Sequence, residues 1–256
     1  TVAEFEAWLA SDADGWLFLD SVDEARLRNP KDLERAVRRL GARKLTTRSA
    51  PVLFPPELAR GLFGAFVGAI SGGALYRRAS FLLDAMDQPV FPAGIDLLQR
   101  PFLPGAAGSS AFDSEGVATE DRTLVEKGVL KGWLLGSYSA RRLGLHSTGN
   151  AGGVFNLLVE GEREPFDALV KRMGTGLLVS ELLGHGVNGV TGDYSRGAAG
   201  YWVENGELAY PVDELTIAGN LRDMFHRIVG LGDDLRPYAS IRTGSVLIDG
   251  LTLAAT

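Results

Sequence analysis

The chain contains no cysteine and only three histidines, at positions 146, 185 and 226. Without cysteine it can form neither a disulfide nor a thiolate metal site, a composition that fits a reducing compartment. Zinc peptidases place two histidines three or four residues apart on one helix, whereas no two histidines here are closer than about forty positions. The sequence therefore predicts no metal ligands and no cofactor in this chain.

Long apolar runs and an excess of positive charge are also missing. No run reaches the roughly 18–20 residues that a membrane-spanning helix needs, and the first residues lack the pattern of a secretory signal. Lys and Arg number 26 against 32 Asp and Glu, which gives a formal net charge of −6. An acidic surface repels phosphate groups, so we do not expect nucleic-acid binding. From the missing apolar run and signal pattern we expect a soluble, cytoplasmic protein that does not bind a membrane.

Strand-like and helical segments follow one another without the regular alternation of a βαβ protein, which favours an α+β fold. A strand is expected at Thr46–Leu53, and a long irregular connector, rich in proline and glycine, at Pro89–Gly108. Two hairpins with glycine in their turns are expected to share one antiparallel sheet: Thr123–Val125 with Val129–Leu135, and Trp202–Glu204 with Glu207–Tyr210. Apolar spacing predicts helices at Lys31–Leu40, Leu58–Ile70, Ser137–Leu143, Pro165–Met173 and Leu221–Val229.

The predicted helix Leu58–Ile70 is unusual because Gly61, Gly64 and Gly68 recur on one of its faces. A glycine inside a helix costs about 1 kcal/mol relative to alanine. Several of them are expected only where another element packs directly against the helix backbone. We therefore expect a strongly curved, mostly antiparallel sheet to wrap around this central helix, with further helices outside. On this view Gly64→Leu would unfold the domain or destabilise it severely.

Two short motifs match known signatures but lack the structural context that their chemistry requires. Residues 184–189 fit the dinucleotide-binding pattern G-x-G-x-x-G, which needs a helix to begin there. Gly192, Asp193 and Gly197 follow instead, so no helix is expected. Ser71 resembles the serine of a nucleophile elbow, but a helix precedes it where the elbow requires a strand. Neither nucleotide binding nor a serine nucleophile at Ser71 is predicted.

A set of polar residues in and near the glycine-rich stretch is the candidate site, because dense glycine implies turns or close approaches of the backbone. Two interpretations stay open. In the first, side chains such as those of Asp193 and Ser195 bond only to nearby amides in turns. In the second, the set forms the wall of a cleft that holds an extended peptide through main-chain hydrogen bonds. The set comprises Asp193, Tyr194, Ser195, Arg196, Asn220 and Arg242.

The stretch from Glu181 to Asn220 closely resembles the C-terminal region of the PmbA/TldD family, bacterial proteins linked to zinc-dependent peptide degradation. Other similar stretches are Pro51–Arg60, Val67–Arg77 and Ser137–Thr148. The resemblance implies that residues 41–256 form a PmbA/TldD-like C-terminal domain. Residues 1–40 resemble the family poorly, and we interpret them as the remnant of a preceding domain.

The resemblance also implies a function. In TldD-like members the helix that corresponds to Leu58–Ile70 carries an H-E-x-x-x-H zinc motif, with a cysteine ligand further on. Here the residues around that position are Phe63, Gly64, Ala65, Phe66, Val67 and Gly68. The implied function is that of a non-catalytic subunit, which pairs with a TldD-like zinc peptidase subunit or forms a homodimer and contacts small or unfolded polypeptides. Zinc is then expected only in the partner, and the family's link to modulation of DNA gyrase follows from proteolysis.

Two other functions remain open at this point. One is a stand-alone hydrolase with an unconventional site, built from Asp193, Ser195 and His185. The other is a structural or regulatory protein that binds its targets as a homodimer.

Overall fold

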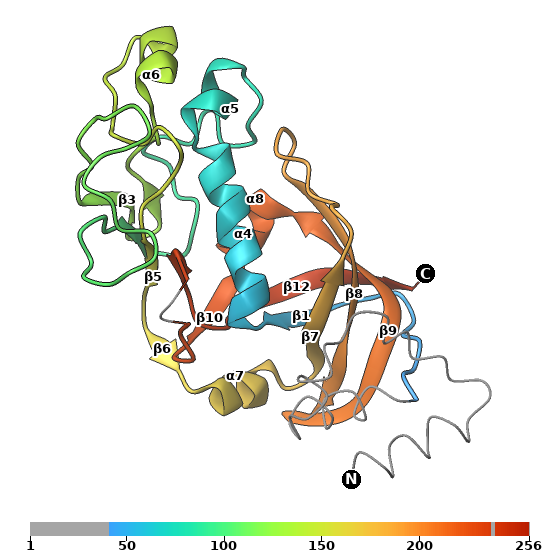
Figure 1. The fold of residues 1–256 in the computed structure, drawn as a ribbon. Helices are drawn as coiled ribbons and strands as arrows, with labels where there is room; N and C mark the ends of the chain where they lie inside the picture. The colour runs from blue at the N-terminus through green and yellow to red at the C-terminus, as the bar shows by residue number, and fades with distance from the viewer. Residues whose placement is uncertain (1–40, 237–238, 256) are drawn as a thin grey trace, which may run out of the picture. The chain divides into compact units, whose positions relative to one another are not determined.

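The computed structural model describes residues 41–236 and 239–255. Contacts between residues divide the chain between Ala42 and Arg43. The unit that begins at Arg43 contains two β-sheets and the helices α4–α8 (Figure 1), so the predicted α+β class is confirmed. The helix predicted at Lys31–Leu40 lies outside the described residues. None of the described helices is long and apolar enough to cross a membrane.

The larger sheet is strongly curved and closes on itself like a barrel. Its strand order is β1–β7–β8–β9–β12–β10–β6, and β1 also pairs with β12, so that β1, β7, β8, β9 and β12 form a ring. Within this ring only the β1–β7 pair is parallel. The strands are β1 (Arg48–Phe54), β6 (Arg163–Glu164), β7 (Gly176–Leu183), β8 (Asp193–Glu204), β9 (Glu207–Asn220), β10 (Ile228–Gly232) and β12 (Val246–Ala255).

A second, smaller sheet has the order β11–β5–β2–β3–β4. Its strands are β2 (Asp96–Gln99), β3 (Arg122–Glu126), β4 (Val129–Leu130), β5 (Leu157–Glu160) and β11 (Ile241–Arg242). The two predicted hairpins therefore belong to different sheets, and the expectation that they share one was wrong. The segment Pro89–Gly108 is not irregular throughout, because its strand β2 lies in the middle of this sheet. Leu97 and Gln99 of β2 are fully buried, and the Gln99 amide donates to Glu120 O at 3.0 Å.

The helices α4, α6 and α7 follow their predicted positions closely, whereas α5 was not predicted and α8 is shorter than predicted. The helices are α4 (Pro56–Ala69), α5 (Gly72–Tyr76), α6 (Ser137–Leu143), α7 (Phe166–Met173) and α8 (Leu221–His226). Asn220 caps α8 as predicted, since its side chain accepts from the Arg222 amide at 3.1 Å. The helix does not continue to Val229, however: Ile228 enters β10 and pairs with Ile248 of β12. Ser71 is the N-cap of α5 and its hydroxyl donates to Gly68 O at 2.7 Å, as expected for a residue at a helix end.

Helix α4 lies between the smaller sheet and the strands β7 and β8 of the larger one (Figure 1). Its residues Phe63 and Phe66 are fully buried and join one hydrophobic core with residues of both sheets. The expectation about its glycines was wrong, because Gly61 and Gly68 are exposed and a Cβ on either would meet no atom within 4 Å. A Cβ on Gly64 would meet only the Ile241 side chain, at 4.0 Å. Within the part of the chain that the structure describes, no backbone packs against these glycines, so α4 keeps an open side there.

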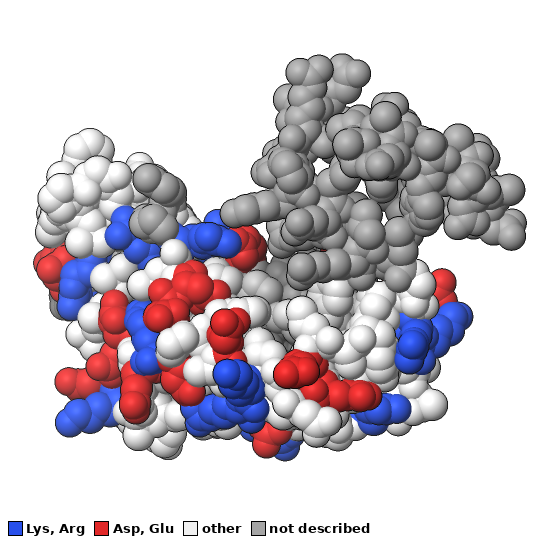
Figure 2. All heavy atoms as spheres, turned by 90° about the horizontal axis from the view of Figure 1, so that it is seen from below, with Lys and Arg blue, Asp and Glu red and all other residues white. Residues whose placement is uncertain are grey.

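The charged side chains of the described unit are interspersed by sign on the face that Figure 2 shows. Acidic and basic residues alternate there over short distances, as the composition of 26 basic and 32 acidic residues suggests. A nucleic-acid interface gathers Lys and Arg on one surface. That face therefore does not favour nucleic-acid binding.

Candidate functional site

The loop between β7 and β8, residues 184–192, is a hairpin in which two backbone segments approach closely. Ser195 N donates to Gly186 O at 2.7 Å, and Asn188 N donates to Asp193 O at 2.8 Å. A Cβ at position 186 would overlap the Ser195 carbonyl group, which explains why glycine stands there. No helix begins in this segment, so the match of residues 184–189 to a dinucleotide-binding pattern has no structural basis.

Asp193 and Asn220 lie opposite each other where β8 begins and β9 ends. The Thr191 hydroxyl donates to Asp193 Oδ2 at 2.6 Å, and Asn220 Nδ2 donates to Asp193 Oδ1 at 3.2 Å. Both hydrogen bonds lower the pKa of the Asp193 carboxyl group, and the one from Thr191 has the larger effect. Asn220 Nδ2 also reaches Thr191 O at 3.0 Å. These contacts are local turn chemistry and fasten the hairpin to the end of β9.

Successive side chains of β8 point to opposite faces of the sheet. Tyr194 and Arg196 therefore share one face, where Tyr194 is only 3% exposed and Arg196 is half-buried. Asp193 and Ser195 lie on the other face and are exposed. The four β8 residues of the predicted set are thus split by the alternation of the strand, and of these four Tyr194 and Arg196 face the interior.

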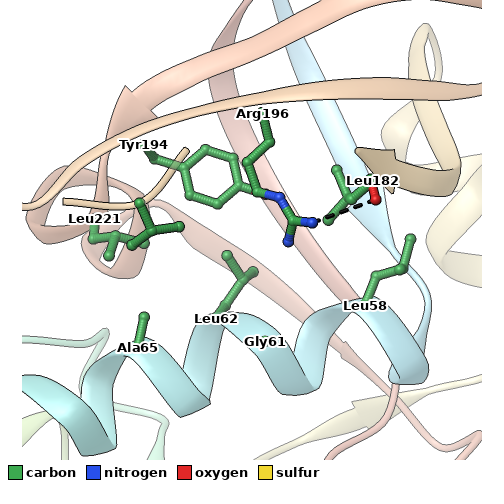
Figure 3. Close-up of a pocket in the computed structure, with 9 residues that line it drawn as sticks. Leu58, Gly61, Leu62, Ala65, Leu182, Tyr194, Arg196 and Leu221 are labelled. Carbon is green, nitrogen blue, oxygen red and sulfur yellow. Dashed lines mark hydrogen bonds between the residues drawn. The ribbon is translucent and has the colours of Figure 1, made fainter. Parts of the chain in front are cut away.

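Tyr194 and Arg196 border a small cavity of about 20 Å³ between β8 and α4 (Figure 3). Figure 3 shows both side chains extending from β8 toward the helix, with Leu58, Leu62 and Ala65 pointing back at them. The contribution of α4 to the lining is Leu58, Gly61, Leu62 and Ala65. The other lining residues, besides Tyr194 and Arg196, are Leu182 of β7, Val187 of the hairpin and Leu221 of α8. We call this cavity the α4–β8 pocket.

The α4–β8 pocket is apolar except for Tyr194 and Arg196. Arg196 Nη2 donates to Leu182 O at 3.3 Å, which holds the guanidinium group against β7. Neither Tyr194 Oη nor Arg196 Nε has a hydrogen-bond partner, although both atoms are buried. Burial raises the pKa of Tyr194 to about 12; the positive charge of Arg196, and its guanidinium group within hydrogen-bonding reach of the phenol oxygen, oppose this rise. The pocket therefore presents a cationic guanidinium group and a neutral phenol side by side, and neither Arg196 Nε nor Tyr194 Oη makes a hydrogen bond of good geometry.

Arg242, the remaining residue of the predicted set, lies on β11 in the smaller sheet and does not line the α4–β8 pocket. Sequence reasoning also missed residues that do line it, above all Gly61, Leu182 and Leu221. The helical spacing of Leu58, Gly61, Leu62 and Ala65 was visible in the sequence and places them along one side of α4. The partner strand of that side was not visible, because it depends on the tertiary fold.

The resemblance implies a zinc ion in TldD-like members of the family, and the described residues of this chain do not fit one. At the middle of α4 the buried side chains are Leu62, Phe63 and Phe66, none of which ligates a metal. Among the described residues no three His, Asp or Glu side chains lie close enough to hold a metal ion. His146, His185 and His226 are all exposed and lie in separate elements. The described donor set therefore does not match the His and carboxylate or thiolate ligands of a zinc site.

Comparison with known proteins agrees with this fold and sequence pattern. Residues 47–255 match the family model of the PmbA/TldA metallopeptidase C-terminal domain. The chain is 52% identical over 220 residues to metalloprotease PmbA of Escherichia coli O157:H7, which covers 86% of this chain and 49% of that protein. It thus spans about half the length of the curated relatives that it matches.

Solved structures give the same result. A proposed modulator of DNA gyrase from Bacteroides thetaiotaomicron superposes with a TM-score of 0.85 at 32% identity, over 89% of this chain and 52% of that one. TldE from Thermococcus kodakarensis has the same fold, with a TM-score of 0.76 at 24% identity over 88% of this chain and 55% of that one. Because the family model covers most of the chain, the protein belongs to the PmbA/TldD family and carries its C-terminal domain.

Proposed function

We propose that this chain is part of a non-catalytic subunit of a zinc metalloprotease assembly of the TldD/PmbA type, which degrades or processes small or unfolded polypeptides. The observation that carries the proposal is α4, where Phe63, Gly64, Ala65, Phe66, Val67 and Gly68 stand around the position of the zinc motif and none of them can ligate a metal. Relatives bear the name metalloprotease, so the reaction is assigned to the assembly. In that assembly a TldD-like partner supplies the zinc that activates water.

The contribution of this chain is the shape of the chamber and contacts to the polypeptide. The α4–β8 pocket supports this role, since it is apolar with two unpaired donors. The exposed side of α4 at Gly61 leaves room for a polypeptide backbone. Asp193, Ser195, Asn220 and Arg242 stay candidates for peptide contact, although the first and third are engaged in local bonds. The link of relatives to DNA gyrase is then indirect, through proteolysis.

The test is to purify the chain, measure its zinc by elemental analysis and assay cleavage of an unfolded polypeptide with and without a TldD-like subunit. We expect less than stoichiometric zinc, no cleavage by the chain alone, and chelator-sensitive cleavage after the partner is added. Stoichiometric zinc in the lone chain would refute the proposal. A pull-down from the native cell identifies the partner, and the cytoplasmic location and the oligomeric state remain predictions that the same experiment addresses.

The same assay decides between the proposal and the two other functions. A stand-alone hydrolase would cleave in the presence of chelator and lose that activity in Ser195→Ala. Among the described residues no hydrogen bond joins Ser195 to His185 or Asp193 through their side chains, so the geometry does not favour it. A homodimeric binding protein would be captured with its target and without any TldD-like subunit.

A further inference from the structure

Among the described residues, two buried polar atoms of the α4–β8 pocket, Tyr194 Oη and Arg196 Nε, make no hydrogen bond of good geometry, although the two side chains lie close to each other. Proteins leave few buried polar atoms unpaired, and each such atom calls for an explanation, for example a missing water or ligand. Here the two atoms come from neighbouring positions on one face of β8, and both residues border the same cavity. Their shared location indicates that one group satisfies both.

The chemistry of the two atoms defines the group that would satisfy them. An Arg Nε–H is a donor, and a protonated Tyr hydroxyl can donate as well. Burial raises the pKa of Tyr194 to about 12, so the phenol keeps its proton at neutral pH. No carboxylate of the described residues lies within ion-pair distance of Arg196. The complement of a cationic donor beside a neutral donor is an anion with two acceptor oxygens, such as a carboxylate.

The walls of the pocket narrow the choice further. Leu58, Leu62, Ala65 and Leu182 surround the two donors, and the cavity measures only about 20 Å³, which is enough for a group of about the size of one or two waters. A small anion at the end of an apolar chain suits this surface. Gly61 is exposed and has open space where a side chain would stand, so a backbone can approach α4 there.

We propose that the α4–β8 pocket recognises a carboxylate of a polypeptide, held by Arg196 and Tyr194 against the apolar side of α4. The inference rests on the proposed function, because it names the chemical group of the substrate that this chain contacts. The carboxylate can come from a chain terminus or from an acidic side chain. The experiment below distinguishes these two sources.

The test measures binding of short peptides to the purified chain by isothermal titration calorimetry. Three probes share one apolar sequence with an acetylated N-terminus: a free C-terminal acid, the C-terminal amide, and the amide with one internal glutamate. We expect the free acid to bind. The plain amide should bind at least about 10-fold more weakly, because it lacks the negative charge that would accept hydrogen bonds in the pocket. Binding of the glutamate peptide to the same level as the acid would mean that the pocket accepts a carboxylate from either source, and tight binding of the glutamate peptide alone would assign it to side-chain carboxylates.

Three variants locate the binding, and each has a matched control. Arg196→Gln and Tyr194→Phe remove the two donors, and Gly61→Leu fills the open space beside α4. The controls are Arg60→Gln and Tyr138→Phe, which change exposed side chains outside the pocket, and Gly68→Leu, at a second exposed glycine of the same helix. We expect at least a 10-fold loss of affinity in the first three variants, unchanged affinity in the controls, and cooperative melting in all six.

Several results would overturn the proposal. They are equal binding of acid and amide, no binding of any peptide, and binding that survives in Arg196→Gln and Gly61→Leu. Inorganic phosphate that binds as tightly as the free acid would show a general anion site and would also reject the assignment. The cleavage assay with a TldD-like subunit tests the proposed function independently. If cleavage still depends on the partner while peptide binding fails, only the carboxylate proposal is rejected.

Discussion

Tyr194 is the residue at which folding and binding place opposite demands on one side chain. Its ring fills a buried position on β8, whereas its hydroxyl lacks a partner. A buried hydroxyl without a hydrogen bond destabilises a protein by roughly 1–3 kcal/mol. Sites that are kept for function commonly carry such a cost in stability. Tyr194→Phe removes the hydroxyl and keeps the ring, so this substitution separates the two demands.

The raised pKa of Tyr194 leads to a prediction about stability at high pH. The pKa is about 12 in the folded protein against 10.0 in the unfolded chain, so the folded state holds the proton more tightly. The corresponding stability is fully present below pH 10 and is lost as the pH rises toward 12, at about 1.4 kcal/mol per pH unit. Urea unfolding at pH 9 and pH 11 should therefore show that wild type loses about 1 kcal/mol more than Tyr194→Phe.

The same experiment contains its own check at neutral pH. There Tyr194→Phe should be as stable as wild type or more stable, because the hydroxyl makes no hydrogen bond of good geometry. A variant that is clearly less stable at pH 7 would mean that the hydroxyl has a structural partner. Equal losses of the two proteins between pH 9 and pH 11 would contradict the raised pKa.

At the scale of the elements, local signals in the sequence predicted what local contacts determine. Helix α6 has its predicted bounds, Ser137–Leu143, and ends at Gly144 in the left-handed conformation. The turn at Asn205-Gly206 joins β8 and β9 as predicted, with positive φ at both residues. Helix α8 was predicted too long because Ile228 is apolar in either context, and its pairing with Ile248 of β12 is not a local property.

Long-range pairing also explains why the strand β2 and the contacts of the α4–β8 pocket were missed. The strand β2 contains only two apolar residues, Leu97 and Leu98, and depends on its neighbours β3 and β5. Tyr194 and Arg196 could be named from the glycine-rich sequence, but their position opposite α4 could not. The glycines of α4 were noticed for a correct reason, since glycine is costly in a helix. The cause inferred from them was wrong, because no atom of the described residues lies within 4 Å of a Cβ placed at Gly61 or Gly68.

The corrected view of α4 gives a prediction that is opposite to the first one. Gly61 lies in the interior of the helix, and a methyl group there would meet no atom within 4 Å. Gly61→Ala should therefore stabilise the protein by up to about 1 kcal/mol, through helix propensity alone. Gly72 of α5 is the control, because a Cβ there would overlap the Ser139 side chain, and Gly72→Ala should destabilise. Denaturant unfolding of both variants measures the two effects, and a loss of stability in Gly61→Ala would show that something packs against α4 after all.

At the scale of the whole described unit, α4 connects the two sheets through one continuous core. Phe66 of α4 makes an edge-on contact with Phe91, with ring centroids 5.2 Å apart, and another with Phe225 of α8 at 6.0 Å. Phe91 belongs to the segment that leads into β2 of the smaller sheet, whereas Phe225 is on the helix that follows β9 of the larger one. The same core cluster includes Leu97 and Leu124 from the smaller sheet and Val179 and Ile217 from the larger. The two sheets should therefore unfold together.

Phe66→Ala tests this coupling. Because the ring is fully buried between the two sheets, its removal should cost about 3–5 kcal/mol, and the loss should appear in both sheets. Hydrogen exchange followed by mass spectrometry measures the opening free energy of peptides from β2–β3 and from β7–β8 separately. Phe112→Ala is the matched control, since Phe112 is 62% exposed and a surface substitution usually changes stability by less than about 0.5 kcal/mol. A loss of protection confined to one sheet would mean that the two sheets are independent units.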